Sequence, residues 1–203
     1  MKWGAIGCIG ILVLLVVLAL PVIGSYNTLV QLDQAVQAQW GQVQNVYQRR
    51  ADLVPNLVET VKGAAAFEKD TFTQVAEARS KVGQVTSEGL QNATNDPQAF
   101  ERFQQAQSGL SSALSRLMVV VEKYPELKAT ANFRDLQAQL EGTENRIAVE
   151  RKRFNDAAQA FNTKRMSFPT VLFAGVFGSR FNEKPYFQAQ AGAETAPKVN
   201  FGK

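Results

Sequence analysis

An uncharged apolar run near the N-terminus constrains this chain more than any other feature. No Asp, Glu, Lys or Arg occurs between Lys2 and Asp33, and residues 3–23 are all apolar or glycine. A helix of these 21 residues rises about 1.5 Å per residue and therefore covers about 30 Å, the thickness of the hydrocarbon core of a bilayer. The run predicts a transmembrane helix, with residues 1–24 as a membrane anchor.

This run has two other interpretations. A secretory signal peptide would be cut after Gly24, but the apolar core of such peptides is about 7–15 residues long, shorter than this run. A lipoprotein signal would use Cys8, because residues 5–8 look like a lipobox. That cysteine precedes the apolar core instead of following it, so we expect an uncleaved anchor.

The orientation of the anchor follows from its few basic residues. Lys2 lies on one side of the run, and no basic residue follows on the other side until Arg49. Because basic residues near a span favour the cytoplasm, the N-terminus is expected inside the cell. The chain is therefore predicted to be a single-pass membrane protein, with its remaining residues in the periplasm or at the cell surface.

Residues 25–166 carry apolar side chains at helical spacing in four successive segments. The last of these segments is the most regular, because five large apolar residues recur every seventh position. A seven-residue repeat is typical of helices that pack nearly parallel with a left-handed twist. We therefore predict an all-α protein, a four-helix bundle after the anchor. The five residues are Phe133, Leu140, Ile147, Phe154 and Phe161.

Helix-breaking signals fall between the four segments. Asp52 with Pro55 predicts the end of the first helix and the start of the second, Asp96-Pro97 predicts the start of the third, and Tyr124-Pro125 predicts its end. The first and third connections are short, which favours antiparallel neighbours. The predicted topology is up-down-up-down, with the loop near residues 86–96 and the end of the fourth helix on the membrane side.

Residues 167–203 differ in character from the bundle. Residues 168–178 are apolar but too few to span a bilayer, whereas residues 188–203 have the composition of a disordered tail. We expect the apolar segment to contact lipid or a neighbouring copy at the membrane-side end of the bundle. The alternative is that it covers the open end of its own bundle. The candidate contact residues are Arg165, Phe168, Leu172, Phe173, Phe177 and Arg180.

Several motifs occur in an order that resembles the LemA family of bacterial membrane proteins. They are YNTLV from Tyr26, RRADLVPNLV from Arg49, TENRIA from Thr143, and the pairs Phe161-Asn162 and Phe168-Pro169. The resemblance covers roughly residues 26–184 and implies a single-span anchor, an antiparallel helical bundle and no enzymatic activity. One branch of that family is tied to magnetosome formation. The sequence departs from the family pattern at Phe67-Glu68 and Phe154-Asn155, where the family often has His-Glu and Tyr-Asn.

The residue inventory disfavours catalysis. The chain has no histidine, and its single cysteine, Cys8, lies in the apolar run. Ser-His-Asp and Cys-His catalysis, and di-iron sites built on Glu-x-x-His, are therefore excluded within this chain. No phosphate-binding or dinucleotide-binding glycine motif occurs. A carboxylate metal site using Glu68 and Glu144 is conceivable but lacks paired spacing, so we expect no enzyme, no metal and no cofactor.

Four charged residues lie on or beside the apolar stripes: Arg50, Glu68, Arg79 and Glu144. Buried charges must be paired and hydrogen-bonded. The pattern predicts a polar layer inside the bundle, which either fixes the register of the helices or forms a binding site. The other interpretation places these charges at the edge of a stripe, with their heads in water.

Positive charge is concentrated towards the C-terminus. Residues 151–203 have a net charge of +6, which leaves −2 for residues 1–150 of a chain with a total of +4. A lipid surface is an expected partner, because basic groups are attracted to anionic headgroups. Nucleic acid is not, because the basic residues lack interleaved stacking aromatics. The sequence therefore favours a membrane-anchored scaffold or adaptor that binds an unknown protein or another copy of itself. The alternative is an extracytoplasmic sensor whose bundle binds a ligand.

Overall fold

The structure is a computed structural model that describes residues 2–63, 68–89 and 93–188, without the side chains of residues 2–16, 18 and 87–89. Four main helices account for most of these residues, which confirms the all-α prediction. They are α1 (Lys2–Lys62), α2 (Lys69–Gly89), α3 (Pro97–Val121) and α5 (Ala131–Met166), with a short α4 (Pro125–Lys128) and two 3-10 turns, η1 (Thr170–Leu172) and η2 (Ser179–Phe181).

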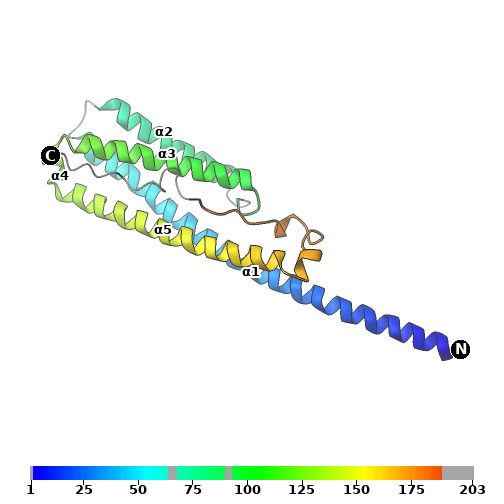
Figure 1. The fold of residues 1–203 in the computed structure, drawn as a ribbon. Coiled ribbons are helices and arrows are strands. Elements are labelled where there is room, and N and C mark those ends of the chain that lie inside the picture. The colour runs from blue at the N-terminus through cyan, green and yellow to red at the C-terminus, as the bar shows by residue number, and fades with distance from the viewer. Residues whose placement is uncertain (1, 64–67, 90–92, 189–203) are drawn as a thin grey trace, which may run out of the picture.

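The helices run antiparallel to their neighbours in sequence (Figure 1). Helix α1 packs mainly along α5, and α2 packs mainly along α3. Figure 1 also shows that the N-terminal part of α1 continues well beyond the bundle, past the end where α5 finishes. The bundle is therefore continuous with one long helix, α1, which leaves it at the end where α5 finishes.

The core consists of two apolar clusters along the bundle. The cluster nearer the α1 exit is aromatic and centres on Trp40, Phe100 and Phe154. The other is mainly aliphatic and includes Leu57 and Leu117. All five residues of the predicted seven-residue repeat in α5 are buried. The heptad spacing in the sequence therefore marks the face that α5 presents to the other helices.

The predicted helix break at Asp52 and Pro55 is wrong, because α1 continues to Lys62 with Pro55 inside it. Proline lacks the N–H that would bond the carbonyl four residues earlier, here that of Ala51. That carbonyl instead accepts a hydrogen bond of 3.2 Å from Nε of Arg79 on α2. The apolar face of this last stretch is buried at Val54 and Leu57. Packing and a donor from a neighbouring helix thus keep the helix intact.

The other helix ends follow the predicted signals. Asp96 precedes α3, and its side chain accepts a 2.9 Å bond from the backbone N–H of Gln98. After Tyr124 the chain forms the single turn α4, and Thr130 then caps α5. The prolines at positions 97 and 125 each occupy a first helical turn, where the missing N–H costs nothing.

The chain turns back at Ser167 and runs along the bundle as a strap, defined here as residues 168–188. It begins with the cis peptide Phe168–Pro169. Phe181 and Phe187 belong to the aromatic core cluster, and Figure 1 shows the strap between the helices. The packed domain therefore extends past residue 166, the boundary expected from the sequence, because these two rings fill space that the helices leave open. The expected disordered tail lies outside the described residues from 189 onward.

Most of the predicted span, residues 3–23, lies outside the residues whose side chains the structure describes. The backbone there belongs to α1. Within the described part of the chain, no helix has both the length and the apolarity needed to cross a membrane.

Candidate functional site

Arg50 forms the centre of a polar layer inside the bundle. It lies on α1, is only 1% exposed, and donates from Nη1 to Ser111 Oγ at 2.8 Å and to Glu144 Oε1 at 2.9 Å. Its Nη2 donates to the carbonyl oxygen of Gln107 at 3.2 Å and also to the side-chain oxygen of that residue. One guanidinium therefore joins α1 to α3 and α5.

The surroundings of Arg50 are unevenly exposed. The side chain of Glu144 is 43% exposed, so the carboxylate reaches the surface while its partner does not. The Arg50 guanidinium lies over the Tyr47 ring, 5.0 Å from its centroid. Burial raises the pKa of the Tyr47 phenol, although the charges of Arg151 and Arg50 act in the opposite direction.

Glu68 and Arg79, the other two predicted members of the layer, lie elsewhere. Glu68 precedes α2 and pairs with Lys123, 3.6 Å away, with its side chain 30% exposed. Arg79 is exposed and bonds the Ala51 carbonyl. The sequence placed both on a second helix that began near residue 52. Because that helix begins at Lys69 instead, Glu68 falls in the preceding connection.

A cavity of about 280 Å³ lies beside Arg50. Its lining carries two cations, Arg50 and Arg151, and two carboxylates, Glu101 and Glu144, together with several glutamines and serines. Such a wall suits a small polar or zwitterionic molecule. No group of three or more potential metal ligands occurs among the residues that the structure describes.

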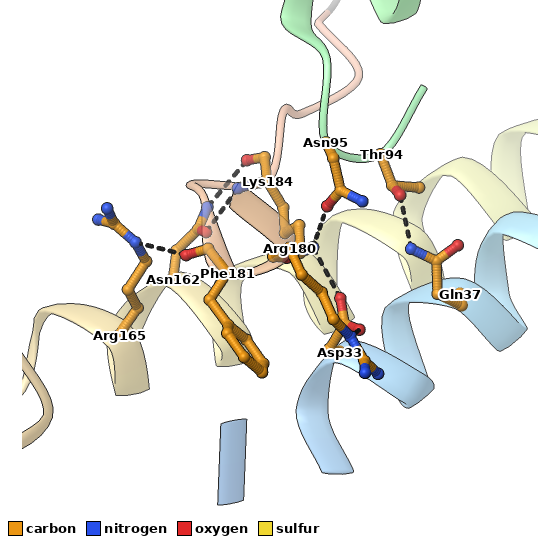
Figure 2. Close-up of polar contacts among 9 residues, drawn as sticks. All are labelled: Asp33, Gln37, Thr94, Asn95, Asn162, Arg165, Arg180, Phe181 and Lys184. Atoms are coloured by element: carbon orange, nitrogen blue, oxygen red, sulfur yellow. Dashed lines mark hydrogen bonds and ion pairs between the residues drawn. The ribbon is translucent and has the colours of Figure 1, made fainter. Parts of the chain in front are cut away.

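A second polar cluster, which the sequence analysis missed, holds the strap (Figure 2). Its centre is Asp33 on α1, which is 2% exposed. Asp33 accepts from Lys184 Nζ and from Arg180 Nε, each at 2.7 Å. Lys184 also donates to the Arg180 carbonyl at 2.9 Å and to the side chain of Asn95, in the loop before α3. The cluster therefore ties three separate segments of the chain together.

Lys184 is the most deeply enclosed charge in this cluster, with its side chain 0% exposed. Burial lowers its pKa, while the hydrogen bond and charge of Asp33 act to raise it. The ammonium also lies 4.7 Å from the centroid of the Phe161 ring. Because isolated buried charges are costly, Lys184 and Asp33 each need the other as a partner, while the half-exposed Arg180 adds a second bond to the same carboxylate.

Two asparagines on α5 clamp the backbone of the strap. Asn162 donates to the Lys184 carbonyl at 2.9 Å and accepts from the Lys184 N–H at 2.8 Å. Asn155, seven residues earlier, makes the same pair of bonds with Phe187 at 2.9 and 2.8 Å. Each asparagine follows a core phenylalanine, Phe154 or Phe161. The repeated Phe-Asn pair is the sequence signal that could have located the strap.

The six candidate contact residues differ in the structure: some are exposed, some are half-buried, and the two arginines form hydrogen bonds within the chain. The first part of the strap, residues 168–177, is called here the apolar turn. In it Phe168 and Leu172 are 80% and 62% exposed. Phe173 and Phe177 are half-buried, and Phe177 packs edge-to-face on Tyr26 of α1 with ring centroids 5.2 Å apart. Arg165 donates to the Phe181 carbonyl at 2.8 Å, and Arg180 bonds Asp33.

A comparison with family models shows that residues 39–201 match the model of the LemA family. The chain belongs to the LemA family. The resemblance to the family is thereby confirmed, and the match begins within α1 and covers the later helices and the strap.

Curated relatives are distant. The chain is 28% identical over 184 residues to magnetosome protein MamQ 2 of Paramagnetospirillum magneticum, which covers 84% of this chain and 67% of that protein. It is 28% identical over 178 residues to magnetosome protein MamQ of Magnetospirillum gryphiswaldense, covering 79% and 65%. It is 22% identical over 152 residues to protein LemA of Metamycoplasma hominis, covering 75% and 64%. This LemA-family chain spans about two thirds of the length of these relatives.

Proposed function

We propose that this LemA-family chain is a membrane-anchored helical scaffold whose bundle binds protein partners or another copy of itself. The observation that carries the proposal is the continuity of α1 from Lys2 to Lys62. The same helix contains the uncharged apolar run and, further along, the core residues Val36, Trp40 and Val43. A bundle built on such a helix is held rigidly with respect to its anchor.

The anchor is supported by the chemistry of the helix where it leaves the bundle. Val17, Leu20 and Ile23 are 57%, 63% and 56% exposed. Three large aliphatic side chains on one short stretch of helix favour lipid or protein surroundings over water. We place the bundle outside the cytoplasm, since the first basic residue after the run is Arg49.

A binding role, rather than catalysis, is supported by the way the charged groups are used. Both buried cations, Arg50 and Lys184, are bonded to carboxylates on α1 or α5 and to other polar groups. They hold helices and strap together. The names of the magnetosome relatives describe a cellular structure and not a reaction.

The test has two readouts on the full chain. Membranes are first washed with alkaline carbonate, after which the chain is expected in the pellet with its N-terminus intact. The chain is then extracted in mild detergent and passed through size-exclusion chromatography, where a second protein or second copy is expected at stoichiometric ratio. Release of a protein beginning at Ser25, or a chain that elutes alone as a monomer, would contradict the scaffold.

The orientation is tested separately. A reporter enzyme that is active only outside the cytoplasm is fused after Lys203. Activity of the reporter in intact cells is the expected outcome, and activity only of a cytoplasmic reporter at the same position would reverse the orientation.

A second candidate, a ligand-binding sensor, is favoured by the cavity beside Arg50. Its lining of Arg151, Glu101 and Glu144 suits a polar ligand. Native mass spectrometry of the extracted chain distinguishes the two functions. A small molecule retained by the native chain and lost in Arg151→Ala would support the sensor, with Arg134→Ala as the matched control on the same helix.

A further inference from the structure

The apolar turn exposes its large side chains on one side only. Thr170 and Ala174 are buried and Phe173 is half-buried, so the inner face is already packed on the bundle. The outer face is strongly exposed, and no described part of the chain covers it. Apolar surface gathered in this way marks a contact with lipid or protein. The outer residues are Phe168 at 80%, Val171 at 51%, Leu172 at 62% and Val176 at 84% exposure.

The turn lies where α1 leaves the bundle. Figure 1 shows the strap beginning at the end of α5, beside the point from which α1 continues alone. The ring of Phe177 packs on Tyr26, and η1 contacts α1 directly. Tyr26 follows Ile23, the last residue of the apolar run, by three positions. That spacing is about 4.5 Å along a helix, so the turn lies level with the end of the run.

Charge at this end of the bundle is positive. Lys164 and Arg165 form the basic last turn of α5, and the strap adds Arg180, whose side chain is 45% exposed. Lys184 is fully buried and its charge is balanced by Asp33. With Glu183 counted, these six residues carry a net charge of +2. Basic groups beside an apolar surface are the combination that binds an anionic lipid interface.

From this geometry we infer that the apolar turn inserts into the headgroup region of the bilayer and forms a second membrane contact beside α1. The occupant is lipid because Phe177 of the turn packs on Tyr26, three positions after Ile23, so the turn lies at the end of the bundle where the exposed Leu20 and Ile23 of α1 emerge. The inference deepens the proposed anchor and rests on it. Two contacts, one along α1 and one at its flank, set the height and tilt of the bundle above the membrane, which one helix alone cannot do.

The test measures the depth of the turn in full-length protein. Cys8 is replaced by serine, and Leu172→Cys is labelled with an environment-sensitive fluorophore in nanodiscs that contain one chain and anionic lipid. We expect a blue-shifted emission, quenching by lipids that carry a shallow nitroxide, and little quenching by aqueous iodide. The matched control is Val119→Cys on α3, whose native side chain is 65% exposed. Its label should show no blue shift, should be quenched by aqueous iodide and should not be quenched by the nitroxide lipid.

Other outcomes overturn the inference. A label at position 172 that iodide quenches and nitroxide lipid does not would place the turn in water. A blue shift that appears only when two chains share a nanodisc, without lipid quenching, would make a second copy the occupant. A label at Leu20→Cys, measured in parallel, reports on the anchor itself. Quenching at position 20 but not at 172 rejects the second contact and leaves the proposed anchor standing, whereas quenching at neither rejects both.

Discussion

At the scale of single residues, the interior of this protein is organised by two buried cations. Arg50 bonds groups on α3 and α5, and Lys184 bonds α1 and the loop before α3. Each has a carboxylate within 3 Å, but Asp33 is buried whereas Glu144 is half-exposed. Removal of the carboxylate leaves the cation in a site with little water. The loss in free energy of unfolding therefore depends on the hydrogen bonds that the cation retains.

The first prediction concerns Glu144. Glu144→Ala should lower the free energy of unfolding by about 1–3 kcal/mol, because Arg50 loses its carboxylate but keeps its bonds to Ser111 and Gln107. Glu141→Ala is the matched control, since Glu141 is exposed and accepts only from Gln137. Its effect should stay within about 0.5 kcal/mol. Equal effects in urea unfolding of the detergent-solubilised chain would mean that Arg50 does not need Glu144.

The second prediction concerns Lys184 and pH. Burial lowers the pKa of this group below the ordinary lysine value of 10.5. Between the folded pKa and 10.5 the unfolded chain therefore binds more protons than the folded chain, and stability increases with pH. This contribution is present above 10.5 and is lost as the pH falls through the folded pKa.

Comparison with Lys184→Met isolates this contribution, because the other titrating groups are the same in both chains. The unfolding free energy of the native chain minus that of the variant should increase as the pH approaches 10.5. Urea unfolding at pH 7, 8, 9 and 10 measures it. If the unfolding free energies of the native chain and of Lys184→Met change in parallel with pH, the environment of Lys184 does not favour its neutral form.

At the scale of elements, the unusual feature is a helix of 61 residues with a proline in its bundle portion. The carbonyl that Pro55 leaves unpaired bonds to Arg79, a residue of the next helix. The connection between α1 and α2 is thus moved from residue 52 to the vicinity of Gly63. A tertiary hydrogen bond replaces a local one.

The third prediction is a coupling between these two positions. Arg79→Ala should cost about 1 kcal/mol in the native background, because the Ala51 carbonyl loses its donor. In a Pro55→Ala background the helix supplies its own N–H, so the same change should cost close to nothing. Thermal or urea unfolding of the four chains gives the coupling directly. Additive effects would mean that water satisfies the carbonyl equally well.

At the scale of the whole molecule, the strap completes the bundle. Phe181 and Phe187 are 2% and 6% exposed, and they contact rings from α1, α3 and α5. From the sequence, residues 168–178 were expected to contact lipid or a neighbouring copy, with covering the open end of the bundle as the alternative. In the structure the inner side chains of the strap close the core, while the outer ones remain exposed.

The fourth prediction is that truncation after Ser167 destabilises the fold. Loss of one buried phenylalanine costs about 3–5 kcal/mol, and the truncation removes two of them together with Lys184. For a chain of this size the melting temperature should fall by about 10 °C or more. Truncation after Gln188 removes no described contact and is the matched control. If both truncations melt with the native chain, the strap is not part of the core.

The sequence by itself determined the features that depend on local pattern. The apolar run, the heptad stripe of α5 and the Asp96-Pro97 start of α3 need only the spacing of side chains and a local cap. The pairing of Arg50 with Glu144 was also within reach, because both lie on or beside stripes that must face the same core.

Only the tertiary structure decided the features that depend on partners far along the chain. Pro55 could remain helical because Arg79, 28 positions from Ala51, supplies a donor, and no local rule predicts such a donor. Lys184 could be buried because Asp33, 151 positions away, lies opposite it. Local propensities are weak, at most about 0.7 kcal/mol for most residues. The larger cost of a proline inside a helix, about 3 kcal/mol, is offset at Pro55 by the Arg79 hydrogen bond together with the burial of Val54 and Leu57.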